Sequence, residues 1–142
     1  MWTGMNFRIL PGVFLLVAAG TLASGQSKKT IRKKQIVSVT VNEYFLEDGM
    51  DKPVVESIEK YNKEGELVEL QEFNKKGEVK KWEKYFYDAD GNMVEQLFLD
   101  GKGRTSRTEK TIYRDSLKVE RQFFDEKGRL YKKKKYLYEY RE

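Results

Sequence analysis

The side chains with the most chemical potential lie near the C-terminus. Four consecutive lysines, Lys132 to Lys135, follow Tyr131, and three further tyrosines come directly after them. Ammonium groups attract anions, and tyrosine combines a large apolar ring with a polar hydroxyl group. Such a mixture is typical of a surface that binds a protein or an anionic glycan. We take these residues as the candidates for binding a partner: Tyr131, Lys132, Lys134, Tyr136, Tyr138 and Tyr140.

The lysine run also has a second interpretation, which the sequence favours. Lys132 to Lys135 fall in the last predicted strand, and lysine on an edge strand is a common protection against edge-to-edge aggregation. We expect the first strand to open with a matching basic group: Lys28, Lys29, Arg32, Lys33 and Lys34. Edge protection and anion binding therefore remain two alternatives for the same residues.

Residue types needed for familiar catalysis are missing. The chain has neither histidine nor cysteine, which removes the commonest general base, thiol nucleophiles and the usual zinc ligands. Asp88, Asp90, Asn92 and Asp100 resemble an oxygen-rich calcium loop, but corresponding positions in other turns are Lys or Glu. We predict that the protein is not an enzyme and needs no metal or cofactor.

Residues 1–25 have the pattern of a signal peptide. A single charge, Arg8, precedes an apolar run from Val13 to Ala19, and small residues end the segment at Ala23 to Gly25. Cleavage after Ala23 and cleavage after Gly25 suit the small-residue rule equally. The apolar run is shorter than the roughly 20 residues of a stable membrane span. We expect a periplasmic or extracellular protein with one domain, residues 26–142.

The charge balance argues against one class of partner. Basic residues number 28 and acidic residues 23, for a net charge of +5. Nucleic-acid-binding proteins carry a denser basic surface, so no nucleic-acid partner is expected.

A turn motif recurs along the chain. An aromatic or large apolar residue is followed by a polar turn seven times, at intervals of 11 to 16 residues, and six of these turns close on glycine. Glycine accepts the left-handed backbone that closes a short hairpin loop. The closing residues are Gly49, Gly65, Gly77, Gly91, Gly103 and Gly128. Arg114 to Leu117 lacks the glycine, so that turn should have a different shape.

Between the turns lie short stretches rich in Val, Tyr, Phe and Thr, which are typical of β-strands. Charged residues interrupt both faces at mid-strand, which disfavours a two-layer sandwich. The sequence predicts an all-β fold, an antiparallel meander of about eight strands built from β-hairpin repeats, in a single-layer twisted sheet. A small up-and-down barrel is the alternative.

The repeats resemble a known class. The units YNKEGELVELQEF, YDADGNMVEQLF and FDEKGRLYKKKKY are similar to YD-type and bacterial MORN-like repeats, over Phe45 to Tyr138. The resemblance implies β-hairpin sheets of the kind found in envelope proteins, toxin shells and antitoxin-like partners of toxins. A second glycine-rich stretch, typical of full MORN units, is lacking, so their lipid-related roles are not expected here.

Together these features lead to one functional hypothesis. We expect an exported, non-enzymatic interaction module that binds a protein partner through its sheet face. An adhesive or glycan-binding envelope protein is the first alternative, and an antitoxin-like immunity protein for an exported toxin is the second.

Overall fold

The computed structural model describes residues 24–46 and 52–142. Its elements are one helix and eight strands: α1 (Lys28–Lys34), β1 (Ser38–Glu43), β2 (Val54–Tyr61), β3 (Leu67–Phe73), β4 (Val79–Tyr87), β5 (Met93–Leu99), β6 (Thr105–Arg114), β7 (Leu117–Phe124) and β8 (Leu130–Lys135). In the described part of the chain, no helix has the length and apolar character needed to span a membrane.

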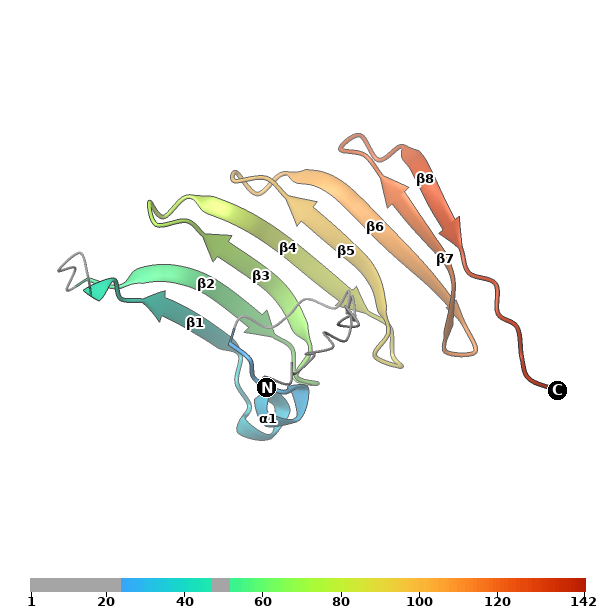
Figure 1. The fold of residues 1–142 in the computed structure, drawn as a ribbon, viewed down its shortest axis with the longest axis horizontal. Helices are drawn as coiled ribbons and strands as arrows, with labels where there is room; N and C mark the ends of the chain where they lie inside the picture. Colours follow the sequence, from blue (N-terminus) through green and yellow to red (C-terminus); the bar gives the residue numbers. More distant parts are fainter. Residues whose placement is uncertain (1–23, 47–51) are drawn as a thin grey trace, which may run out of the picture.

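The strands form one antiparallel sheet in chain order, β1 to β8 (Figure 1). Each strand pairs with its predecessor and its successor, and β1 and β8 are the two edges. The predicted all-β meander is therefore confirmed. The barrel alternative is wrong, because the sheet does not close and β1 has no pairing with β8.

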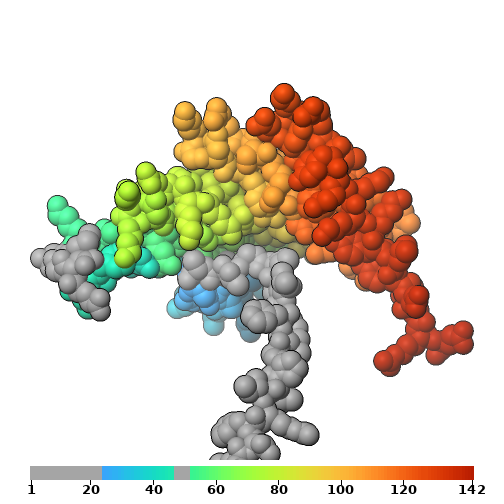
Figure 2. Space-filling model, turned by 45° about the horizontal axis from the view of Figure 1, so that its top comes forward, coloured from blue at the N-terminus to red at the C-terminus, as the bar shows by residue number. Residues whose placement is uncertain are grey.

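A β-bulge or register shift occurs in every strand pair. Between β4 and β5, for example, Phe86 pairs with Glu95 but Tyr87 pairs with Met93. Bulges bend a strand and increase its twist. The sheet is accordingly bowed into an arch, and α1 lies on the inner, concave side of the arch (Figure 2).

The turns show why the motif repeats. In each of the five described glycine-closed turns, an Asn or Asp begins the turn; at Asp100, Oδ1 accepts the backbone N–H groups of Lys102 and Arg104, each at 2.9 Å. The five described closing glycines, Gly65, Gly77, Gly91, Gly103 and Gly128, have φ between +74° and +80°, as predicted. Gly49 lies outside the described residues.

The turn without glycine differs as expected. Asp115 and Ser116 both have positive φ, 51° and 63°. Two such residues in succession are the mark of a tight two-residue hairpin, in which Asp is one of the better tolerated types. The strands on either side, β6 and β7, continue pairing up to Arg114 and Leu117.

The first basic group is not part of a strand, so this prediction is wrong. Residues Lys28–Lys34 form α1, whose N-cap Ser27 accepts the N–H of Thr30 at 3.1 Å, and whose C-cap Gln35 is left-handed. Lysine and arginine favour helices, and Ile31 supplies the one fully buried contact. The first edge strand, β1, therefore carries Ser, Thr and Asn instead of lysine, whereas β8 carries the lysine run as expected.

The hydrophobic core lies where α1 covers the sheet. Its buried members are Ile31, Tyr61, Leu67, Leu70 and Tyr85. All but Ile31 come from β2, β3 and β4. The helix packs against the N-terminal half of the sheet, beside the β2–β3 turn, and no described element lies over the C-terminal half (Figure 1).

Candidate binding face

The strand register assigns side chains to the two faces of the sheet. Residues directly opposite each other in paired strands share a face. Glu59 of β2 is opposite Leu70, Leu70 is opposite Glu83, and Leu70 packs with Ile31 of the helix, so these residues lie on the concave face. Continuing through the register assigns Phe98, Arg107, Glu109, Arg121, Phe123, Lys132 and Lys134 to the same face.

The half covered by the helix is acidic. Its concave side chains include Glu59, Glu72 and Glu83, with Lys81 the single basic residue of β2 to β4 on this face. Helix α1 carries five basic side chains, and one of them, Lys28, forms an ion pair with Glu66 of the β2–β3 turn. We call this part of the concave face the covered half.

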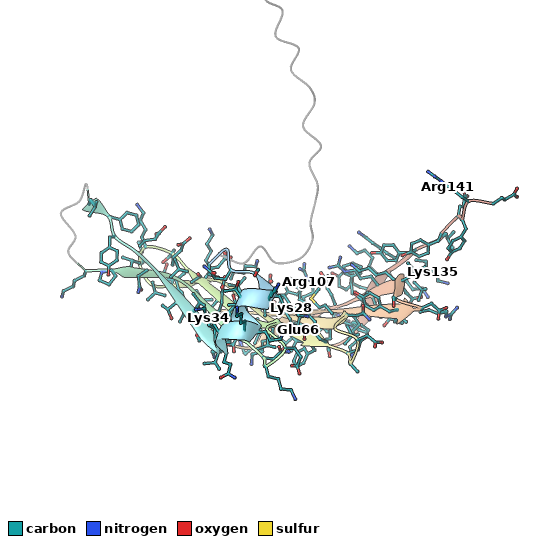
Figure 3. All side chains as sticks on the ribbon, turned by 90° about the horizontal axis from the view of Figure 1, so that it is seen from below. Lys28, Lys34, Glu66, Arg107, Lys135 and Arg141 are labelled. Carbon is teal, nitrogen blue, oxygen red and sulfur yellow. The ribbon has the colours of Figure 1, made fainter. Side chains whose placement is uncertain are left out.

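One ion pair ties the helix to the sheet. Lys28 Nζ lies 2.7 Å from Glu66 Oε1, and Asn62 Nδ2 donates to Glu66 Oε2 at 3.0 Å (Figure 3). Burial alone would raise the pKa of Glu66, but the hydrogen bonds from Lys28 and Asn62 outweigh it and the pKa is lowered. Glu66 is therefore held as a carboxylate by its contact with α1.

Two buried carboxylates lie deeper on this face. Glu59 is fully buried and accepts hydrogen bonds from Tyr61 Oη and from Ser24 N (3.1 Å) and Ser24 Oγ (2.6 Å). Glu83 accepts from Tyr85 Oη at 2.5 Å and from Gln96 Nε2 at 3.1 Å. Burial and the neighbouring Glu59 raise the pKa of Tyr61 to about 12, so the phenol stays a proton donor.

The open half, from β5 to β8, has the opposite charge. Its concave side carries Arg107, Arg121, Lys132 and Lys134, with Glu109 as the single acid among them. Glu109 is buried and pairs with both arginines, at 3.3 Å from Arg107 Nη2 and closely with Arg121. The two lysines have no carboxylate partner within 4 Å among the described residues.

Aromatic rings lie beneath these cations. The guanidinium of Arg107 stacks 3.8 Å from the ring centre of Phe98. Phe123 is only 6% exposed on a face with no covering element, because Lys132 Nζ (4.1 Å) and Lys134 Nζ (5.8 Å) lie over its ring beside Arg121. Cation–π contacts hold the basic groups close together in spite of their mutual repulsion.

The predicted binding residues divide into two groups. Tyr131, Lys132 and Lys134 are gathered around Phe123; the rings of Tyr131 and Phe123 are 6.5 Å apart. The other three tyrosines lie beyond the regular strand, which ends at Lys135. Tyr138 Oη donates to the carbonyl of Lys118 at 2.7 Å, and Tyr140 is 77% exposed.

The role of Tyr138 is structural and repeats along the sheet. Tyr87 Oη donates to Leu67 O at 2.8 Å, and Tyr113 Oη donates to Met93 O at 3.3 Å, each bond spanning 20 residues as in Tyr138. The bond ties the ends of β4 and β6, and the segment after β8, to the start of the preceding strand, whereas Tyr61 at the end of β2 donates to Glu59 instead. Of the three tyrosines after the lysine run, Tyr138 thus has a hydrogen bond within the sheet, and their part in binding a partner stays a prediction.

Sequence reasoning missed Phe98, Arg107, Arg121 and Phe123. The signal was available in the similar segments VELQEF, VEQLFL and VERQFF, which make up most of β3, β5 and β7. Aligning them places Leu70, Gln96 and Arg121 at one position, and Glu72, Phe98 and Phe123 at another. Read in this way, the concave face changes from acidic and apolar to basic and aromatic along the chain.

The acidic turn does not converge on a metal position. Asp88 Oδ1 accepts the N–H groups of Asp90 (3.0 Å) and Asn92 (2.9 Å), so its carboxylate holds the turn. A cleft of about 520 Å³ separates this turn from α1, lined by Lys28, Arg32, Glu64, Glu66 and Asp90 among others. Among residues 24–46 and 52–142, no group of three or more acidic side chains is placed to hold a metal ion.

Comparison with known proteins adds no assignment. No protein-family model matches the chain, and no curated protein sequence matches it.

Proposed function

We propose that the protein is an exported, non-enzymatic binding module whose open half docks an acidic segment of a partner protein. The open half is defined by Phe98, Arg107, Arg121, Phe123, Lys132 and Lys134. One observation carries the proposal: the sheet presents four basic side chains around two aromatic rings, with one glutamate among them, on a face without a second layer. The export part of the proposal is supported by the signal-peptide pattern of residues 1–25.

The covered half supplies a precedent within the same molecule. There, an element of one charge lies on a sheet face of the other charge, anchored by a single buried apolar residue, Ile31, and one ion pair, Lys28 to Glu66. With the charges exchanged, the open half suits an acidic amphipathic helix. Carboxylates would contact Lys132 and Lys134, and an apolar side chain would pack beside the stacked side chains of Arg107 and Phe98.

Charge also argues against two other occupants. A second copy of α1 carries basic residues at five of seven positions and would be repelled. An anionic glycan matches the charge but makes less use of the rings, because several of its sugar faces would have to stack on rings already shielded by cations. We therefore favour a protein partner and treat the glycan as a competing outcome of the test.

The test uses matched variants of one strand. Lys132 and Lys134 lie on the concave face, whereas Lys133 and Lys135 lie on the opposite face of the same strand. The probe is a fluorescent helical peptide with glutamates on one face and leucines on the other, measured by anisotropy. We expect K132E/K134E to bind at least roughly tenfold more weakly than wild type, and K133E/K135E within about twofold.

Salt dependence and a second probe complete the experiment. Binding of the peptide should weaken as ionic strength rises, because exposed charges are screened. Equal losses in the two double variants would contradict docking on the concave face. Tighter binding of a polygalacturonate fragment than of the peptide would replace the protein partner with a glycan.

A further inference from the structure

Glu59 is a buried carboxylate that contacts Ser24, the first described residue, and it has no cation beside it among the described residues. Glu59 is fully buried, and its hydrogen-bond donors are the amide and hydroxyl of Ser24 and the phenol of Tyr61, all of them neutral. No Lys or Arg lies within 4 Å of it among the described residues. A buried carboxylate without a compensating charge is costly to a fold.

The other buried acids of the concave face do have cations. Glu66 pairs with Lys28 at 2.7 Å, Glu83 is 3.6 Å from Lys81, and Glu109 pairs with two arginines. Glu59 is the exception among these four. The group that could supply the missing cation is the Ser24 nitrogen, which lies 3.1 Å from Glu59 Oε1.

The position of Ser24 in the sequence makes that nitrogen a special one. It follows Ala23, one of the two bonds that suit signal peptidase by the small-residue rule. Hydrolysis of the Ala23–Ser24 peptide bond adds one water, leaves a carboxylate on Ala23 and leaves an ammonium on Ser24. The neutral N–H that donates to Glu59 would become a cation in the same place.

We propose that the chain is cut between Ala23 and Ser24 during export, and that the new amino terminus forms an ion pair with Glu59. Cutting after Gly25 would instead remove Ser24 and leave Glu59 with Tyr61 alone. The structure thus distinguishes two cleavage positions that the sequence leaves equal. The inference rests on the export part of the proposed function, and it adds a role for processing in completing the concave face.

Intact mass provides the first test. The full precursor is expressed in a Gram-negative host, recovered from the periplasm and weighed by mass spectrometry. A mass for a chain beginning at Ser24 is expected. A chain beginning at Gln26 would overturn this inference while leaving export intact, whereas retention of Met1 would overturn export itself.

The second test measures the reactivity of the new amine. An amine paired with a buried carboxylate stays protonated and shielded; a pKa raised by about one unit alone lowers the neutral form roughly tenfold. We expect trace acetylation of the processed protein, with lysines as internal standards, to modify the N-terminal peptide at least about tenfold more slowly than in E59Q.

Two further variants separate the ion pair from folding in general. E83Q removes another buried carboxylate that accepts from a tyrosine two residues away, and should leave N-terminal labelling slow. S24A keeps the amine and loses the hydroxyl, and should also remain slow. Fast labelling of wild-type protein, or equal rates in E59Q and E83Q, would contradict the ion pair even when cleavage occurs at Ser24.

Discussion

The covered and open halves of the concave face are built from the same repeat but differ in charge. In the covered half, Ile31 of a basic helix is buried against leucines and tyrosines of the sheet, and Lys28 pairs with Glu66. In the open half, the corresponding strands carry arginines, lysines and phenylalanines and meet no element of the described chain. The repeat therefore specifies the backbone, while a few inward-facing positions decide what the face accepts.

The largest effect should come from removing the helix anchor. Ile31 is fully buried, so Ile31→Ala should lower the free energy of unfolding by about 2–5 kcal/mol, as for other buried aliphatic truncations. Leu137→Ala, at a residue 94% exposed, should change it by less than about 0.5 kcal/mol. Urea denaturation measures both. A near-neutral Ile31→Ala would mean that α1 contributes little to the covered half.

A pair of glycines isolates the contact between helix and sheet. Gly65 and Gly77 have the same strained φ, +79° and +78°, but a Cβ at Gly65 would lie 2.6 Å from Lys28 O, whereas a Cβ at Gly77 meets nothing within 4 Å. Gly77→Ala should cost roughly 1 kcal/mol from backbone strain alone. Gly65→Ala should cost clearly more, because α1 must move.

Urea or thermal unfolding of the Gly65→Ala and Gly77→Ala variants gives the loss of stability in each. Similar losses in Gly65→Ala and Gly77→Ala would show that the helix yields without resistance. Such a result would weaken the comparison between a covered and an open half.

A smaller loss of stability is expected when the pH is lowered. The pKa of Glu66 is lowered by its contacts with Lys28 and Asn62, despite burial. Its contribution is therefore fully present above the ordinary glutamate pKa of about 4.3 and is lost as the pH falls through the lower, folded value. Wild-type protein should lose more stability than Glu66→Gln between pH 6 and pH 3, as measured by urea midpoints at each pH.

The chain offers a matched control for this titration. Glu78 accepts from the turn residue Asn74 at 2.7 Å, as Glu66 does from Asn62, but it has no helix above it. Glu78→Gln should keep the wild-type pH dependence. If Glu66→Gln and Glu78→Gln behave alike, the ion pair with Lys28 does not hold the helix.

The smallest loss of stability is expected from removing a tyrosine hydroxyl. The same kind of hydrogen bond can be removed at two places in the sheet. Tyr87→Phe removes a part-buried bond to Leu67 O and should cost about 1 kcal/mol. Tyr138→Phe removes the same kind of bond, to Lys118 O, where 42% exposure lets water take its place, and should cost less. Equal thermal shifts in the two variants would indicate that the end of the sheet is as tightly held as its middle.

Local turn chemistry made the sheet predictable. Asn or Asp followed by a closing glycine determines each hairpin within a few residues. The missing glycine at Arg114 to Leu117 likewise predicted a turn of different shape. Helix α1 was missed because a seven-residue basic segment with a single buried residue, Ile31, has no apolar stripe. Its position depends on a tertiary contact, not on local pattern.

The binding face was only partly predictable for a related reason. The lysine run is conspicuous in the sequence. The sequence does not show, however, that Lys132 and Lys134 lie over the ring of Phe123, beside Arg121, on the neighbouring strand. That neighbourhood depends on the register, and every strand pair has a shift in it. The three later tyrosines lie beyond the end of β8 at Lys135, a boundary that the sequence did not reveal.

The most direct test of docking on the open half is a residue-by-residue map. Backbone amide NMR spectra of the processed protein would be recorded while the acidic helical peptide is added. We predict that shift changes gather on β5 to β8, strongest around Phe98, Arg121 and Phe123, and spare β1 to β3. Changes confined to β1 to β3, or none at saturating peptide, would contradict the account.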